Sequence, residues 1–455
     1  MKSLHIAGLI LLLSASSCKK YLDKVPDKSL SVLTEIGQYQ QLIDNQNLYH
    51  QMANLSEFGT DNYYLLEKDW NSRVNIFKNA YTWEKDIYEG NDGQNQDWSY
   101  PYSAIYYCNV LLEGLSKLQP ESGQISEYNN LIAQGLFLRA YSHFQLSETY
   151  GQPYRPATAD SDLGIPLRLS QNLTAPIQRA TNSQTYNQIT SDLKQAATLC
   201  NTPFQASNRI RPSKAMIYGM LSRVYLTMQD YQKAKNYADS SLSLYSKLID
   251  YNTLNSSSTA PFPFPDNEEV LFAAKRLNGN YIFSPTCIID SVLYQSYSDD
   301  DLRKTLYFSI AQPAKTPYLK AAYSGSAVPF IGLATDEVYL NRAECLARAG
   351  LTEAALADLN TLLEKRYKTG KYTKITVTSA EQALMLILEE RRKELLFRGL
   401  RWTDLRRLNQ QENTAITLKR VLAGKTYLLV PNDPKYTYPI PPGEIQLSGI
   451  IQNPR

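Results

Sequence analysis

Three polar segments rich in aromatic residues are the parts of this sequence best suited to binding chemistry. Flat rings stack on the apolar C–H faces of a ligand, and Asp, Asn and Arg side chains bond to its hydroxyl groups, a combination that suits sugars. The segments are Gly59 to Tyr64, Trp70 to Arg73, and Asn278 to Tyr281. The residues that we expect to contact a ligand are Asp61, Asn62, Tyr63, Tyr64, Trp70, Arg73, Asn280 and Tyr281.

No set of residues meets the requirements of a catalytic site. The chain holds three histidines, too few and too widely spaced for a zinc site or a histidine-based triad. Gly424-Lys425-Thr426 matches the end of a phosphate-binding loop, but Lys419 stands where that loop requires glycine. We therefore predict that the protein is not an enzyme and has no cofactor. The histidines are His5, His50 and His143.

Two acidic segments invite other interpretations. Asn91 to Asp97 offers oxygen ligands that could hold Ca²⁺, but it lacks the bidentate Glu that closes an EF-hand, so a solvated loop is favoured. The consecutive acids Asp299-Asp300-Asp301, together with the aromatic loops, suggest a secreted glycoside hydrolase. Consecutive residues do not define two carboxylates on opposite sides of a bond, so this hypothesis ranks below binding.

The N-terminus is organised like a secretory signal. A charged start precedes the apolar stretch Leu4 to Leu13, and small residues then lead to Cys18. Such a stretch is too short for a membrane core, which takes about 20 residues. A cysteine in this place resembles a bacterial lipoprotein signal, so we predict a signal peptide at 1–17 and a lipid-anchored tether at 18–30. A plain signal peptide with an incidental Cys18 is the alternative.

Composition narrows the class of protein. The formal net charge is +3, which favours neither a basic nucleic-acid binder nor an acidic disordered chain. Tyrosine is abundant, with 34 residues against 12 Phe and 4 Trp, and such rings serve helix packing, ligand stacking or both. No Cys-x-x-Cys pair occurs, and no disulfide can be assigned. Cys108 and Cys345 lie among apolar neighbours, where free cysteines fill space.

Helical periodicity dominates the chain and predicts a mainly α protein. The segments 51–98 and 273–329 have no such periodicity and are expected to be irregular, with a short extended segment at Val270 to Phe272 and a Pro-rich tail. Thr181 or Ser183 is expected to cap one helix. The expected helices are 31–44, 102–118, 128–150, 183–200, 215–228, 231–248, 336–349, 352–366 and 380–397.

Two helix pairs carry the residue spacing of tetratricopeptide units. The first uses Tyr218, Leu221, Tyr225, Tyr231 and Ala234. The second uses Tyr339, Ala343, Leu346, Gly350, Ala355 and Leu359, with Gly350 as the turn. Because the pairs lie far apart in the sequence, we expect large insertions to interrupt them, so that they form no continuous solenoid. Ordinary helical hairpins at both places are the alternative.

A charged segment near the C-terminus is interpreted as structural. Opposite charges three and four positions apart in Glu389 to Glu394 are typical of an ion-paired helix face. Further on, Gly399 ends that helix, and Asp404 lies among several arginines. We expect a corner that ion pairs hold in place rather than a catalytic site.

An ordered series of short motifs resembles the SusD/RagB family of bacterial outer-membrane lipoproteins and covers nearly the whole mature chain. Two departures, Arg398 and Arg455, fall at positions that look structural. The motifs are Cys18 with Tyr21-Leu22-Asp23, Tyr102 to Leu111, Leu138 to Tyr141 leading to Tyr150-Gly151-Gln152-Pro153, Asp336 to Glu344, Arg391 to Arg407, and Tyr438-Pro439-Ile440-Pro441 with Gln452-Asn453-Pro454.

The resemblance implies a right-handed scaffold of tetratricopeptide-like helix pairs with long loop-rich insertions on a ligand-binding face. An N-terminal region would span 31–250 and a C-terminal region 251–455. Segments 59–64 and 278–281 are placed like the family's ligand loops, and Asp61 matches an acidic position that some members use for ligand. Trp83 and Trp98 are placed like aromatics that pack against the helices.

The resemblance also implies a role. A palmitate-type lipid on Cys18 would anchor the protein at the outer surface of the outer membrane, where it would cap a SusC-like TonB-dependent transporter and capture nutrients, usually glycans. A tetratricopeptide-type adaptor that binds peptide segments in an envelope complex is the alternative. The ligand itself stays open among starch, host glycan, plant polysaccharide and peptide.

Overall fold

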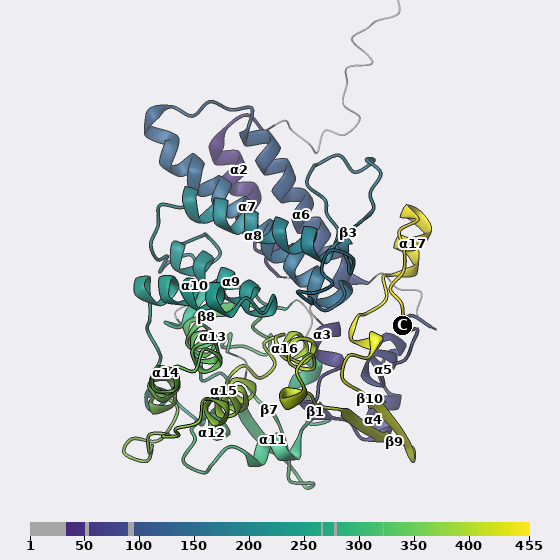
Figure 1. Cartoon of the computed structure of the whole chain (residues 1–455), viewed down its shortest axis with the longest axis vertical. Coiled ribbons are helices and arrows are strands. Elements are labelled where there is room, and N and C mark those ends of the chain that lie inside the picture. The colour runs from purple at the N-terminus through teal and green to yellow at the C-terminus, as the bar shows by residue number, and fades with distance from the viewer. Residues whose placement is uncertain (1–32, 51–53, 90–94, 265–266, 277–279, 322) are drawn as a thin grey trace, which may run out of the picture.

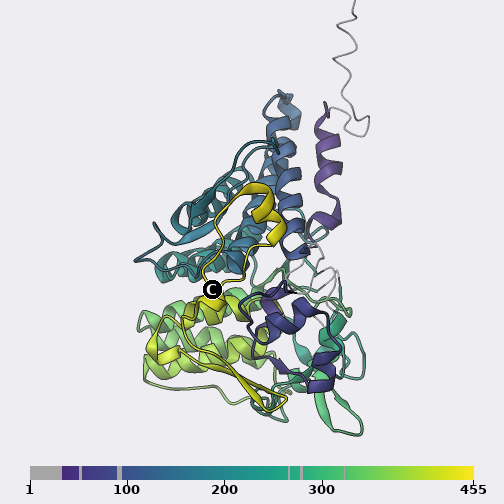
Figure 2. The same ribbon diagram turned by 90° about the vertical axis from the view of Figure 1, so that its right-hand side faces the viewer.

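The computed structural model describes residues 33–50, 54–89, 95–264, 267–276, 280–321 and 323–455, and its ribbon is shown in Figures 1 and 2. The predicted signal peptide, tether and Cys18 lie outside these ranges. The helices are α2 (Ile36–Ile43), α3 (Leu55–Phe58), α4 (Glu67–Asn71), α5 (Asn75–Tyr81), α6 (Gln96–Leu115), α7 (Ile125–Tyr150), α8 (Asn182–Leu199), α9 (Lys214–Thr227), α10 (Tyr231–Leu244), α11 (Ser291–Gln295), α12 (Arg303–Tyr307), α13 (Thr335–Arg348), α14 (Thr352–Glu364), α15 (Ala380–Glu394), α16 (Arg401–Leu408) and α17 (Pro442–Ser448).

The strands among the described residues are short and pair only as two-stranded antiparallel sheets. The pairs are β1–β5, β2–β3, β4–β8, β6–β7 and β9–β10. The strands are β1 (Tyr63–Tyr64), β2 (Leu163–Pro166), β3 (Arg179–Thr181), β4 (Val270–Phe272), β5 (Ile288–Ile289), β6 (Phe308–Ala311), β7 (Thr316–Leu319), β8 (Leu333–Ala334), β9 (Leu418–Leu422) and β10 (Lys425–Leu429).

The long helices form one row of neighbouring antiparallel pairs. α6 packs on α7, α7 on α8, α8 on α9 and α9 on α10, and α13 then packs on both α10 and α14. The row runs from the top of Figure 1 to its lower left. The expected insertion between α10 and α13 is present in the sequence, but the expectation that it prevents a continuous helix array is wrong, because α10 packs directly on α13. The insertion between α10 and α13 loops out, and α13 returns to continue the stack, so the predicted tetratricopeptide-like pairs are confirmed as parts of one scaffold.

Local sequence signals explain several helix ends. Thr181 caps α8 in a reciprocal pair of bonds with Gln184, as expected. Gly350 takes a φ of +76° in the turn between α13 and α14, a conformation that residues with a Cβ rarely adopt. The exception is α6, which begins at Gln96 and passes through Pro101 instead of starting after it. The Asn95 side chain accepts from the Asp97 N–H and supplies the earlier start.

The segment expected to be irregular before α6 contains α3, α4, α5 and β1. These elements lie beside β9 and β10 at the lower right of Figure 1. Trp83 and Trp98 are buried in the hydrophobic cluster of this half, with 2% and 7% exposure, which confirms the expectation that they pack in the core. Among the described residues, no helix combines the length and apolarity needed to cross a membrane.

The tyrosines and cysteines mostly serve the core. Tyr225 stacks on Tyr237 with ring centroids 5.5 Å apart, joining α9 to α10. Every cysteine in the described part of the chain is buried and free, and desolvation raises the pKa of the Cys345 thiol to about 12. Buried thiols of this kind act as small hydrophobes rather than nucleophiles.

The charged segment near the C-terminus forms the expected corner. Asp404 on α16 accepts from Arg391 of α15 at 2.8 Å and from Arg407 at 3.1 Å. Arg407 also donates to both carboxylate oxygens of Glu344 on α13. Burial acts to raise the pKa of Glu344, but Arg407 and Arg348 outweigh it and lower that pKa to about 2. The network locks α13, α15 and α16 together.

Candidate functional site

The predicted ligand segments meet on one face, which we call the loop face. It consists of residues 61–64, α4, α5 and residues 280–290, at the lower right of Figure 1. Strand β1 pairs with β5, placing Tyr63 opposite Ile289 and Tyr64 opposite Ile288. This pairing brings the two predicted ligand loops together although they lie far apart in the sequence.

Arg73 and Tyr281 are joined through a shared aromatic layer. The Arg73 Nη2 donates to the Thr286 Oγ1 at 2.6 Å, and its guanidinium lies 5.6 Å from the centre of the Phe77 ring. Phe77 meets Tyr281 edge to face at 5.1 Å, and Tyr281 in turn meets Phe58 at 5.1 Å. Both predicted residues are partly exposed at the edge of this layer, although burial raises the pKa of the Tyr281 hydroxyl well above its usual value, so contact with a ligand stays a prediction.

Trp70 lies on α4 with part of its ring exposed. Its Nε1 donates to the backbone carbonyl of Lys78 on α5 at 3.3 Å, and the Lys78 ammonium lies 5.7 Å from the centre of the ring. The hydrogen bond fixes the ring without covering it. Trp70 therefore offers a partly preorganised aromatic surface, and contact with a ligand stays a prediction.

Asp61 is held by two arginines. Arg401 donates through Nε and Nη2 to the two carboxylate oxygens, each at 2.8 Å. Arg392 donates to the Asp61 backbone carbonyl at 2.8 Å, and its Nη2 lies 3.1 Å from the Asp61 Oδ2. Burial acts to raise the pKa of Asp61, but Arg401 and then Arg392 outweigh it and hold the pKa well below its usual range. The carboxylate therefore joins the loop face to α15 and α16.

Asn62 and Tyr63, two of the residues expected to contact a ligand, are buried. Their exposed fractions are only 1% and 3%, and the Tyr63 hydroxyl donates to the Phe58 carbonyl at 3.2 Å. Both side chains are therefore buried, and Tyr63, the first residue of β1, points toward the core. Tyr64, the next residue on β1, points the other way and is 37% exposed. Asn280 begins the short 3₁₀ helix Asn280–Phe283, and Asn278 and Gly279 lie outside the described residues.

A hollow of about 270 Å³ adjoins Asp61 and Tyr64 and extends to β9. Its lining adds Asp290, Lys419 and Arg420, three charged residues that were not expected to contact a ligand. Nothing in the sequence around β9 distinguishes these basic residues from an ordinary surface strand. The Arg420 guanidinium is fixed over the Tyr81 ring at 3.4 Å and donates to the Phe58 carbonyl at 3.2 Å.

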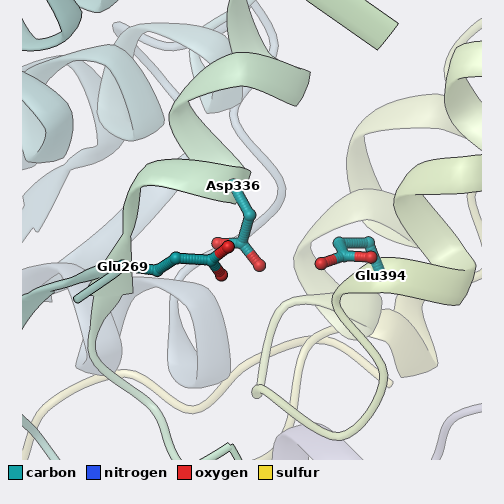
Figure 3. A group of neighbouring side chains, drawn as sticks. All are labelled: Glu269, Asp336 and Glu394. Atoms are coloured by element: carbon teal, nitrogen blue, oxygen red, sulfur yellow. The ribbon is translucent and has the colours of Figure 1, made fainter. Parts of the chain in front are cut away.

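Three buried acids lie close enough together to be examined as a metal site, namely Glu269, Asp336 and Glu394 (Figure 3). Each of them already accepts a hydrogen bond from an arginine. Arg366 donates to Glu269 and to Glu394, each at 2.8 Å. Arg398, one of the two departures from the family pattern, donates to Asp336 at 3.0 Å. A divalent cation among them would face these guanidinium groups, so the trio belongs to the structural core.

The pKa values of Glu269 and Glu394 are shifted in opposite directions. Burial raises the pKa of Glu269 to about 8, against the attraction of Arg366. For Glu394, burial acts in the same direction, but Arg366 and Arg303 outweigh it and lower the pKa to about 2. The Tyr323 hydroxyl donates to Glu269 as well. The network ties the insertion, through Glu269, to α13 and α15.

The segment Asn91 to Asp97, considered above as a possible Ca²⁺ loop, is only partly within the described ranges, since residues 91–94 lie outside them. The described end of the segment is engaged in protein contacts. Asp97 accepts from the backbone N–H groups of Asn54 at 2.8 Å and Leu55 at 3.3 Å. Burial raises the pKa of Asp97 to about 7 despite these bonds. A solvated loop without bound calcium stays the prediction for this segment.

Comparison with known families gives two matches in chain order. A SusD-like family model, described as "Starch-binding associating with outer membrane", matches residues 20–226. The SusD family model matches residues 318–455. Together the two matched ranges leave out only the first residues and the segment that contains most of the insertion.

Individual relatives agree. The chain is 24% identical over 375 residues to the SusD-like protein P2 of Formosa agariphila, a match that covers 68% of this chain and 71% of that protein. The structure is similar to that of a putative sugar-binding protein from Bacteroides vulgatus, with a TM-score of 0.74 and 22% identity over 93% of this chain and 99% of the other. A SusD superfamily protein from Bacteroides thetaiotaomicron gives a TM-score of 0.74 and 23% identity over 93% and 100%. Ordered motifs, helical scaffold and family matches lead to one conclusion: this chain belongs to the SusD family.

Proposed function

We propose that this protein is a cell-surface lipoprotein that captures oligosaccharides or polysaccharides and delivers them to a SusC-like TonB-dependent transporter in the outer membrane. The observation that carries the proposal is the loop face on a SusD-family scaffold. There, the exposed ring of Tyr64 and the partly exposed side chains of Trp70, Arg73 and Tyr281 gather from segments far apart in the sequence.

The chemistry of this face suits a sugar. Rings stack on the apolar faces of a pyranose, and the Arg73 guanidinium offers donors to its hydroxyl groups. Because Trp70 and Arg73 are already held by hydrogen bonds to Lys78 and Thr286, little side-chain freedom is lost on binding. No catalytic step is part of this proposal, because Asp61, the acid beside Tyr64, is held in ion pairs with Arg401 and Arg392.

Ligand binding is tested with the Cys18→Ala chain, which lacks the lipid acceptor, on an array of glycans. Retention of at least one glycan, lost or weakened about tenfold in Trp70→Ala, supports the proposal; aromatic contacts of this kind are worth about 0.5–1.5 kcal/mol beyond area burial. Tyr100→Ala, which removes a partly exposed aromatic side chain on α6 outside the loop face, is the matched control and should bind as the unchanged chain does. Reducing ends released from a bound polysaccharide would instead identify a hydrolase.

The location and the transporter are tested in cells. Metabolic labelling with a palmitate analogue should mark the unchanged chain and leave Cys18→Ala unmarked. Protease added to intact cells should degrade the protein, and mild solubilisation should co-purify it with a large outer-membrane barrel. Protection from protease until the outer membrane is broken would contradict surface exposure. Purification with periplasmic partners alone would favour the peptide-binding adaptor.

A further inference from the structure

A second hollow, of about 420 Å³, lies on elements that the loop face does not use. We call it the α6 groove. It runs along α6 and is bounded by residues 166–177 and by α17 near the C-terminus. In Figure 2 the yellow C-terminal segment with α17 crosses in front of the helices of the first half of the chain.

Three aromatic residues form a line along this groove. Trp98, Tyr102 and Tyr106 are spaced four apart on α6, so they share one helix face and follow one another at steps of about 6 Å. The Trp98 and Tyr102 ring centroids lie 4.9 Å apart. The Tyr102 and Tyr106 side chains are partly exposed, whereas most of Trp98 is covered. A line of rings suits a ligand with repeating flat units.

Hydroxyl groups accompany the rings. Ser99 and Ser103 follow Trp98 and Tyr102 in the sequence and also line the groove. Within the described part of the chain, the two serine hydroxyls and the Tyr106 hydroxyl have no hydrogen-bond partner. All three are at least partly exposed, so they are available to donate to and accept from a polyhydroxylated ligand.

The groove is preorganised. The Tyr102 hydroxyl donates to the Pro166 carbonyl at 2.8 Å, and Asn109 donates to the carbonyls of Arg168 and Ser170, both at 3.1 Å. On the other side, the Trp98 Nε1 donates to the Glu444 Oε2 at 3.3 Å. Both walls are therefore attached to α6, and a ligand would not have to order them.

The charge of the groove is balanced. Arg168 and Glu444 are the two charged residues in its lining, one of each sign. The Arg168 Nη1 is already used by the Ala175 carbonyl at 3.0 Å. This balance disfavours a phosphorylated or strongly acidic ligand and suits a neutral one.

We propose that the α6 groove is a second binding site for a neutral oligosaccharide, which stacks on the exposed parts of Tyr102 and Tyr106, with Trp98 supporting Tyr102 from below, and bonds its hydroxyls to Ser99 and Ser103. The ligand class rests on the proposed function, but the site is separate from the loop face. Two sites on one molecule would raise the avidity for a polymer that spans both.

A protein partner is the competing occupant. Leu173 in the groove lining and Leu447 on α17 are 65% and 87% exposed, and apolar side chains at a rim suit a protein surface. The free hydroxyls and balanced charge of the groove itself favour a sugar, because a protein partner with an apolar surface would make few interactions with those hydroxyls and charges.

The test is hydrogen exchange of the Cys18→Ala chain with and without neutral hexasaccharides of glucose, xylose and mannose in α- and β-linked forms. Slower exchange in residues 98–110 or 166–177 supports the groove. Slower exchange confined to residues 59–73 and 280–290 would support the proposed function but contradict the sugar site in the α6 groove. Slower exchange at neither place contradicts both. Protection of the groove by a co-purified transporter, with none from any sugar, identifies a protein-docking surface and also overturns the proposal.

Variants separate ring stacking from folding. Tyr106→Ala should weaken the groove's sugar binding about five- to tenfold, and Tyr106→Phe, which keeps the ring, should restore most of it. Tyr100→Ala on the same helix is the matched control, since Tyr100 is partly exposed but does not line the groove. Ser103→Trp, which adds bulk to an exposed position, should block the groove while Trp70-dependent binding continues. Equal sugar protection of residues 98–110 in Ser103→Trp would overturn the assignment.

Discussion

Arg401 donates two parallel hydrogen bonds to the Asp61 carboxylate, each 2.8 Å long, although the two residues lie 340 positions apart in the sequence. Bidentate pairs of this geometry are among the stronger ion pairs in proteins. Asp61 therefore connects the loop face to the corner formed by α15 and α16. Asp61 therefore supports the loop face, and its direct contact with a ligand stays a prediction.

This relationship predicts the effect of Asp61→Asn. Removing the charge leaves Arg401 and Arg392 without their shared partner, so the free energy of unfolding should fall by about 2 kcal/mol. Urea denaturation measures the loss, and Glu67→Gln is the control. A variant of unchanged stability that loses glycan binding would show instead that Asp61 acts on the ligand.

Trp83 and Trp70 should have different roles, the first in stability and the second in glycan binding. Trp83 is 2% exposed and its Nε1 donates to the Gly59 carbonyl, so Trp83→Ala should cost about 3–5 kcal/mol of stability. Trp70→Ala removes a partly exposed ring and should lower glycan affinity with less than half that stability loss. Calorimetry of folding and binding on both variants checks this. Equal destabilisation by the two would remove Trp70 from the binding surface.

Acid should weaken the fold. Glu344 and Glu394 have folded pKa values of about 2, and Asp61 also lies low. A carboxyl of this kind binds fewer protons when folded, so its stabilisation is present above its unfolded pKa of 4.5 for Glu and lost as the pH falls toward 2. Denaturant titrations at successive pH values should show this decline. A flat profile below about pH 4 would contradict the ion-pair account.

The stabilisation that Glu269 contributes should depend on pH in the opposite direction and fall as the pH rises. Its folded pKa is about 8 and its unfolded value 4.5, so folding takes up a proton between them. The stabilisation is complete below the unfolded pKa and is lost as the pH rises through the folded one. Glu269→Gln keeps the protonated form's hydrogen-bonding capacity and should flatten the decline between those values. An unchanged slope would show that Glu269 is ionised in the fold.

Two glycines should respond with opposite signs. Gly350→Ala places a Cβ at a φ of +76° and should destabilise the α13–α14 turn by about 1–2 kcal/mol. Gly37→Ala lies in the first turn of α2 with no atom near the added Cβ, and should gain up to about 0.5 kcal/mol. Thermal unfolding measures both. A neutral Gly350→Ala would contradict the assigned turn.

The sequence predicted the long helices well because their signals are local. Thr181 caps α8, and Gly350 stands in its turn. The start of α6 was missed because the apolar periodicity used to place the helix begins only at Tyr102, whereas Asn95 supplies a cap further upstream. The stacking of α10 on α13 could not be predicted, since it depends on how a long insertion folds back.

The site was predicted less completely than the fold. The aromatic loops were found by composition, but the alternation of β1 decides that Tyr63 is buried and Tyr64 exposed, and β1 gives no periodic signal over two residues. The partner of Asp61 comes from a different helix, so no local pattern contains it. The line of Trp98, Tyr102 and Tyr106 is visible in the sequence, but only the positions of residues 166–177 and α17 make it a groove.

The central claim is that the loop face binds glycan. A crystal structure of the Cys18→Ala chain soaked with the glycan selected on the array tests it most directly. The account predicts electron density for a sugar ring against Trp70 or Tyr64, with a hydroxyl within hydrogen-bond distance of Arg73. Sugar density that is absent from this face at saturating glycan, whether or not it occurs in the α6 groove, would contradict it.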